Sequence, residues 1–160
     1  MTELHDIPAI DYSRDVMRLS TLRGRKYQKA INRLIKRRGA RCNRAGVFDE
    51  IEEVELARLG RCKATAGLAV TPRGEWFAAL DWWTATAGGG AAPRVTQATA
   101  YPSRDIALTA MRMRAYEKFH RIAERAHDSC LTDGMRAEAA KMALLLETSF
   151  APQPQLELFA

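Results

Sequence analysis

The residues with the clearest chemistry in this 160-residue chain are the lysines and arginines near its N-terminus. Between positions 14 and 44 there are 12 Lys or Arg residues and one acidic residue, Asp15, whereas the whole chain has 25 basic and 19 acidic residues. The rest of the chain is therefore mildly acidic. A basic segment on an acidic body favours a polyanionic partner, because Lys and Arg side chains bind phosphate groups.

Two helices are expected to carry these charges. Apolar residues recur at helical spacing over 12–22 and again over 25–38, and Gly39 is suited to end the second helix. One side of this second helix can pack while the other side binds phosphate. The predicted nucleic-acid contacts are Arg25, Lys26, Lys29, Arg33, Lys36, Arg37 and Arg38. The alternative is a solvated helix face, or pairing with the acidic residues at 49–55.

A second basic ridge is predicted on a long helix from about 104 to 127, for which Ser103 is a suitable N-cap. Its members follow one another at i, i+4, i+7 and i+11, beside an apolar stripe. These further candidate nucleic-acid contacts are Arg114, Lys118, Arg121 and Arg125. In the alternative interpretation, their aliphatic stems only cover the apolar stripe.

Groups suited to catalysis or metal binding show no comparable pattern. His120 and His127 lie two helical turns apart with only Glu124 as a nearby partner, and the surrounding residues do not form a zinc-protease motif. Glu75 and Asp81 fall on one predicted strand, but no nuclease motif accompanies them. The glycine-rich stretch at 88–93 lacks the lysine of a phosphate-binding loop. We therefore expect no catalytic residue, no metal, no cofactor and no enzymatic role.

The helices and strands predicted along the chain are typical of an α+β fold. A third helix is expected from 47 to 59, because apolar residues recur there at helical spacing. The middle of the chain then changes to the alternation typical of strands. The further predicted elements are a three-stranded antiparallel meander with strands over roughly 65–71, 75–85 and 94–101, the long helix over 104–127, and a last, short helix from Thr132 or Asp133 to about 148.

The chain is expected to form one domain with an appendage. Residues 1–148 are predicted to form a single α+β domain that includes the basic segment 14–44, and residues 149–160 an extended tail. No apolar run, 142–146 included, approaches the length of a membrane span, and the first residues do not resemble a secretory signal. We therefore expect a cytoplasmic protein without a membrane partner. The composition does not indicate an oligomeric state.

The last nine residues, PQPQLELFA, contain a pattern of high specificity. Pro152 and Pro154 disfavour helix and promote an extended arm. The five residues QLELF that follow resemble, at every fixed position, the QLxLF peptide with which bacterial polymerases and repair factors bind the DNA sliding clamp. This resemblance implies a bacterial clamp as the partner.

The same resemblance implies a role for each fixed position of the peptide. Leu158 and Phe159 would fill the hydrophobic pocket of the clamp, Leu156 would cover its rim, and Gln155 would form hydrogen bonds. Glu157 is at the variable position. The alternatives are a tail that folds onto its own core or a C-terminal signal for proteolysis.

The middle of the chain resembles a second family over about 50 residues. GEWFAALDWW followed by TAYPSRDIALTAMRMRAYEKF is similar to the βββα unit of AP2-type DNA-binding domains. The arginine-rich first strand of those domains is missing, since Lys63 is the one basic residue in KATAGLAV. The globular body is not assigned to a family by this resemblance.

Together these patterns predict a replication or repair accessory protein that binds the sliding clamp and contacts DNA through its basic surface. One alternative is a phage protein or toxin that occupies the clamp and excludes polymerase. Another is a DNA-binding regulator with an incidental tail. Clamp binding by itself does not distinguish the accessory protein from the protein that excludes polymerase.

Overall fold

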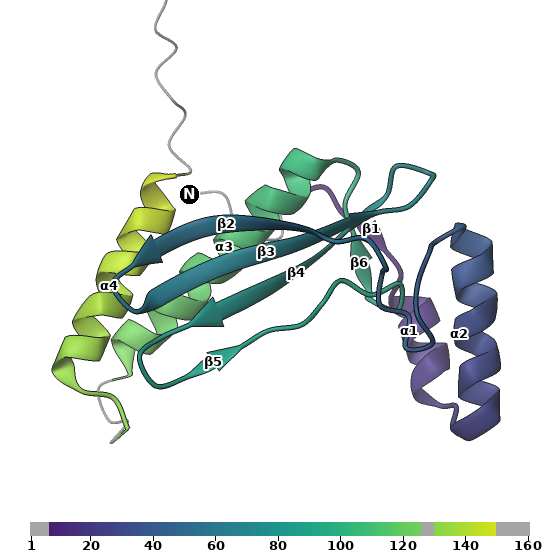
Figure 1. Ribbon diagram of the computed structural model, residues 1–160, viewed down its shortest axis with the longest axis horizontal. Helices are drawn as coiled ribbons and strands as arrows, with labels where there is room; N and C mark the ends of the chain where they lie inside the picture. The colour runs from purple at the N-terminus through teal and green to yellow at the C-terminus, as the bar shows by residue number, and fades with distance from the viewer. Residues whose placement is uncertain (1–6, 126–129, 150–160) are drawn as a thin grey trace, which may run out of the picture.

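The computed structural model describes residues 7–125 and 130–149, and its architecture is α+β, as predicted. The centre is an antiparallel sheet with strand order β2-β3-β4-β5. Its strands are β2 (Glu52–Leu59), β3 (Cys62–Val70), β4 (Trp76–Trp83) and β5 (Gly88–Gly89). Helices α3 (Arg104–Glu124) and α4 (Asp133–Thr148) pack together on one face of this sheet, and the other face is open (Figure 1).

Alternation along β3 separates the two faces of the sheet. Cys62, Ala64, Ala66 and Leu68 are buried under the helices, while the residues between them are only half-buried. The alanines are small enough for α3 to approach the sheet closely. Each large apolar side chain buried in this core, such as Leu68, contributes about 1.5–3 kcal/mol before the cost of ordering is subtracted.

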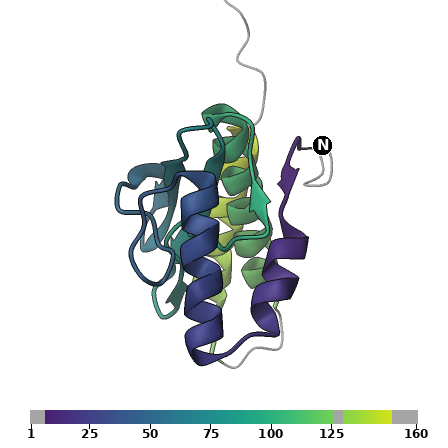
Figure 2. The same ribbon diagram turned by 90° about the vertical axis from the view of Figure 1, so that its right-hand side faces the viewer.

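The N-terminal helices form the opposite end of the molecule. Strand β1 (Ile10–Asp11) leads into α1 (Ser13–Ser20) and α2 (Gly24–Arg38), and β1 pairs with β6 (Thr99–Ala100). A separate core joins α1 and α2 to the sheet end, and its members include Leu19, Ile31, Leu34, Phe48, Phe77 and Val95. In Figure 1 α2 lies at the right-hand end and α4 at the left, and Figure 2 shows α2 nearest the viewer with α4 behind.

Most of the predicted helix boundaries are confirmed. Gly39 ends α2 in the left-handed conformation, with φ 64°, which glycine adopts without steric cost. The Ser103 hydroxyl accepts a hydrogen bond from the Ile106 backbone N–H and caps α3. Thr132 caps α4 in the same way, through the backbone N–H of Met135.

The predicted helix at 47–59 is wrong. Residues 52–59 form β2, which pairs with β3 and reverses into it at Gly60, where φ is 55°. The apolar residues Val54 and Leu56 pack on the core from alternate positions, and a bulge follows Glu55. The spacing of these apolar residues fits both the period of a helix and that of a strand. The segment is extended because it pairs with β3, which follows it in the sequence.

The third predicted strand is only partly formed. Within 94–101 the structure has Thr99–Ala100 as strand β6, which pairs with β1, and Tyr101 beside it forms an isolated antiparallel bridge to Trp76 of β4. The fourth position of the main sheet is taken by β5, from the glycine-rich stretch. An added Cβ at Gly88 would lie 2.3 Å from the Trp83 ring, so the absence of a side chain permits this pairing.

Candidate nucleic-acid interface

Helix α2 presents a continuous face of basic side chains. At about 100° per residue, six of them fall within about 120° of the helix circumference. They are Arg25, Lys26, Lys29, Arg33, Lys36 and Arg37, and all six are exposed. We call this set the α2 basic face. Ile31 and Leu34, on the opposite side of the helix, are buried in the core.

Acidic residues leave most of this face unneutralised. Lys29, Arg33 and the other members except Arg37 form no ion pair with any residue in the described ranges 7–125 and 130–149. The acidic segment that precedes β3 pairs elsewhere: Glu50 lies 3.9 Å from Arg41, and Glu52 pairs with Arg104. The predicted alternative of pairing with the acids at 49–55 therefore does not apply to α2.

The beginning of α2 adds further positive potential. Arg23 occupies the N-cap position and its side chain gives no capping hydrogen bond. Arg25 and Lys26 lie in the first turn, where the helix dipole is already positive, and no acidic residue is present there. This arrangement destabilises an isolated helix and favours a bound anion.

Arg38 does not belong to the α2 basic face. Its side chain is only 3% exposed, and its guanidinium donates to the Val95 carbonyl and to Asp15, the latter at 2.9 Å. The guanidinium carbon lies 3.7 Å from the centre of the Tyr12 ring. The sequence predicted Arg38 as a nucleic-acid contact. Because it is buried, Arg38 instead joins α2 to the body of the protein.

Asp15 joins both helices at this junction. It accepts a hydrogen bond from Arg37 at 2.8 Å as well as the one from Arg38. Burial raises the pKa of Asp15, but the hydrogen bonds from the two arginines outweigh burial and hold this pKa below its usual value of 3.8. Asp15 is therefore a charged anchor that fixes α2 against α1.

Tyr12 and Glu75 attach the same junction to the sheet. The Tyr12 hydroxyl donates to the Glu75 carboxylate at 2.6 Å. Burial, together with this hydrogen bond, raises the pKa of Tyr12 above 10.0. Glu75 is thus used in packing and is not paired with Asp81 as a nuclease site would require.

The predicted basic ridge on α3 is dispersed. Lys118 is half-buried, and its Nζ lies 4.1 Å from the centre of the Trp82 ring, so it covers an aromatic side chain. Arg121 lies 3.7 Å from Glu117. Arg114 and Arg125 are exposed, but the four do not form one unneutralised face. They also lie on the helix that packs beside α4, away from the end of the molecule that carries α2 (Figure 1).

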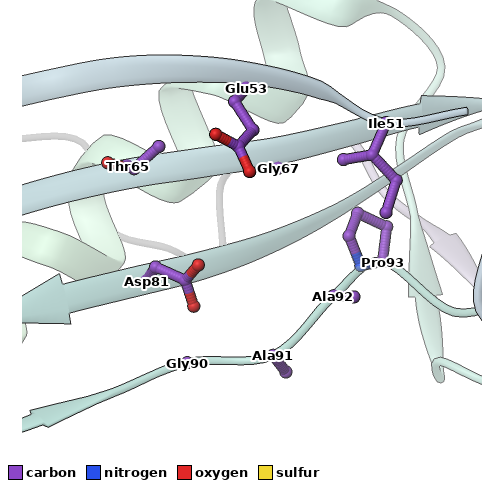
Figure 3. A pocket seen from close by; sticks show the side chains of 9 residues that line it. All are labelled: Ile51, Glu53, Thr65, Gly67, Asp81, Gly90, Ala91, Ala92 and Pro93. Carbon is purple, nitrogen blue, oxygen red and sulfur yellow. The ribbon is translucent and has the colours of Figure 1, made fainter.

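The open face of the sheet carries an acid-lined groove of about 300 Å³ (Figure 3). Glu53, Thr65 and Asp81 line it from three neighbouring strands, and Pro93 closes one end. Gly67 forms its floor, where an added Cβ would lie 3.2 Å from Pro93. Sequence reasoning missed this groove, because the cross-strand register brings its residues together. Carboxylates repel phosphate, so this face is unsuited to nucleic acid.

Histidine, cysteine and acidic side chains are the remaining candidates for chemistry among the described residues. No group of three or more His, Cys, Asp or Glu side chains within them is placed to hold a metal ion. His120 pairs with Glu124, at 3.3 Å, on the exposed side of α3. Burial raises the pKa of the Cys42 thiol to about 11, which leaves it protonated and unreactive at neutral pH.

The predicted clamp-binding residues Gln155, Leu156, Leu158 and Phe159 lie outside the described residues. The structure does place the point from which they continue. Helix α4 ends at Thr148, and the backbone N–H of Ser149 caps it by bonding to Leu146 and Glu147. The tail therefore starts from the helix that lies farthest from α2.

Comparisons with known proteins find no relative for this chain. No family model matches its sequence, and neither curated proteins nor solved structures give a match. Among the helices that the structure describes, none has both the length and the apolar composition needed to cross a membrane.

Proposed function

We propose that the chain binds the bacterial DNA sliding clamp through its C-terminal QLELF peptide and contacts DNA through the α2 basic face. Such a protein would act as a replication or repair accessory rather than as an enzyme. The observation that carries the proposal is the peptide itself, since all four fixed positions of QLxLF are present after two prolines. Leu158 and Phe159, buried in a clamp pocket, would contribute about 1.5–3 kcal/mol each before ordering costs.

The arrangement of the described residues supports this division of roles. Helix α4, from which the tail continues, and α2 lie at opposite ends of the long axis (Figure 1). One end can therefore be tethered to a clamp while the other contacts the DNA that the clamp encircles. Two weak contacts that act together bind more tightly than either contact alone, because each raises the local concentration of the other.

A titration with purified clamp tests the proposal. The intact chain is compared with Gln155→Ala and with the double variant Leu158→Ala and Phe159→Ala. We expect micromolar binding by the intact chain, at least tenfold weaker binding by Gln155→Ala, and no measurable binding by the double variant. Glu157→Ala is the matched control, since the variable position should tolerate the change.

Equal binding by all of these variants would refute the clamp proposal. If the clamp binds, a primer-extension assay separates the accessory from the inhibitor. An accessory leaves clamp-dependent synthesis intact at stoichiometric concentration, whereas an inhibitor reduces it and loses this effect in the double variant. Site-specific DNA binding that is indifferent to the tail would instead identify a regulator.

A further inference from the structure

We infer that the α2 basic face binds the phosphate backbone of double-stranded DNA without reading the base sequence. The inference rests on the proposed function, which takes DNA as the polyanion that α2 binds. It adds that the DNA is double-stranded and that the contacts are to its phosphates. Three observations carry it: the length of the face, the occupation of the neighbouring amide side chains, and the position of the aromatic residues.

The dimensions of the face match a stretch of duplex backbone. Arg25 and Lys36 are separated by 11 residues, which corresponds to about 17 Å along an α-helix. A strand of duplex DNA places a phosphate about every 3.4 Å along the axis but winds around that axis, so a straight face of this length lies beside several phosphates rather than following one strand. Five side chains of the face have no acidic partner among the described residues, so as many as five phosphates can be neutralised.

The amide side chains beside this face are already engaged in hydrogen bonds. Gln28 donates from its amide nitrogen to the Asn32 side chain at 3.1 Å and to the Arg44 carbonyl at 2.9 Å. These amides are the two on α2 that are suited to pair with adenine, and they are bonded to each other. The exposed arc itself consists of Lys and Arg, which bind phosphate without sequence preference; the guanine contacts that Arg can also make need a helix seated in the major groove, and a comparison of two unrelated duplexes detects them.

The aromatic side chains to consider within residues 7–125 and 130–149 are Tyr27, Trp82 and Trp83, and none of the three lies on the basic face. Tyr27 lies on the side of α2 opposite the basic face. Trp82 is covered by Lys118. Trp83 is 58% exposed, but it lies against Gly88 on the same side of β4 as Asp81, whose carboxylate lines the acidic groove. The part of the chain that the structure describes therefore offers a single strand no surface on which bases stack while phosphates meet cations.

Fluorescence anisotropy with the full chain tests the inference. The probes are two 25-base-pair DNA duplexes of unrelated sequence, a single strand of the same length, and a duplex RNA. We expect the two DNA duplexes to bind within about twofold of each other and the single strand at least about tenfold more weakly. The logarithm of affinity should fall against the logarithm of salt concentration with a slope of about −4 to −5, as five neutralised phosphates require.

Charge-matched variants locate the contact. Lys29→Gln with Arg33→Gln should reduce the magnitude of the salt slope by about 2 and weaken duplex binding at least about tenfold. Arg114→Gln with Arg121→Gln removes the same charge from α3 and should change affinity less than about twofold. Circular dichroism and urea unfolding establish that both double variants are folded.

Several results would overturn the inference. They are a preference of more than tenfold between the two DNA sequences, tighter binding of the single strand or of the duplex RNA, or an equal loss in the α3 variant. Because the assay contains no clamp, its outcome is independent of the tail. Duplex binding without clamp binding would refute the clamp part of the proposed function and leave this inference standing. Clamp binding without duplex binding would refute this inference and leave the clamp part standing.

Discussion

The two basic helices α2 and α3 carry similar side chains and use them differently. On α2, six exposed cations share one side of a helix that forms the end of the molecule, and five have no acidic partner among the described residues. On α3, Lys118 covers Trp82 and Arg121 pairs with Glu117. A count of basic residues at helical spacing does not distinguish the two; the neighbours of each side chain do.

The same comparison holds within α2. Arg37 and Arg38 are adjacent in sequence and both contact Asp15, yet Arg37 is 56% exposed and Arg38 is 3% exposed. The difference follows from helix geometry, since a step of about 100° turns Arg38 toward Tyr12 and the core. One residue is thus available to an external anion and the other is part of the fold.

The largest effect is expected from Arg38→Ala. The change removes the hydrogen bond to Val95 and the ion pair with Asp15 from a buried site, so we expect the free energy of unfolding to fall by about 3–5 kcal/mol. Urea unfolding measures it. Arg37→Ala is the control and should cost less than about 1 kcal/mol, because that pair is exposed. Similar losses in both variants would contradict the distinction between them.

Asp15→Asn tests the charged anchor. The variant keeps the shape but loses the charge-assisted hydrogen bonds, which are worth about 1.5–3 kcal/mol at pH 7. Because the pKa of folded Asp15 lies below 3.8, its contribution is present above pH 4 and is lost as pH falls through the folded pKa. The stability difference between wild type and variant should therefore shrink below about pH 4. A difference that stays constant with pH would exclude Asp15 as its source.

Lys118→Ala tests whether the α3 cation stabilises the fold. Its contact with Trp82 predicts a loss of about 1 kcal/mol and a change in tryptophan fluorescence. Lys118→Met keeps an aliphatic side chain and should recover the part of the stability that comes from covering the Trp82 ring. If neither variant alters stability or fluorescence, Lys118 belongs with the exposed cations of α2.

The smallest expected effect is a gain in stability, at Lys29. Lys29 stands one turn from both Arg25 and Arg33, and like charges at this spacing repel by a few tenths of a kcal/mol. Lys29→Gln should therefore raise the free energy of unfolding by about 0.5 kcal/mol while it weakens duplex binding. Lys29→Arg should change neither. A loss of stability in Lys29→Gln would mean that Lys29 supports the fold.

Local sequence patterns were sufficient to predict helices α2, α3 and α4. Apolar periodicity places Ile31 and Leu34 inward, and capping chemistry at Ser103 and Gly39 marks two helix ends within a few residues. They were insufficient for β2, because its apolar spacing suits helix and strand alike and its partner β3 lies beyond the next turn. The pairing of β1 with β6 joins segments about 90 residues apart, which no local pattern reveals.

The sequence by itself determined helices α2, α3 and α4, the α+β class and the order of residues in the QLELF tail, since each depends on neighbours within a few positions. Only the tertiary structure decided which cations remain exposed. It buried Arg38 beside Tyr12, spread Lys118 over Trp82, and brought Glu53 and Asp81 together on the open face of the sheet. The physical reason is that charge acts through space: its effect depends on the groups that packing brings within a few ångströms, and residues distant in the chain supply most of them.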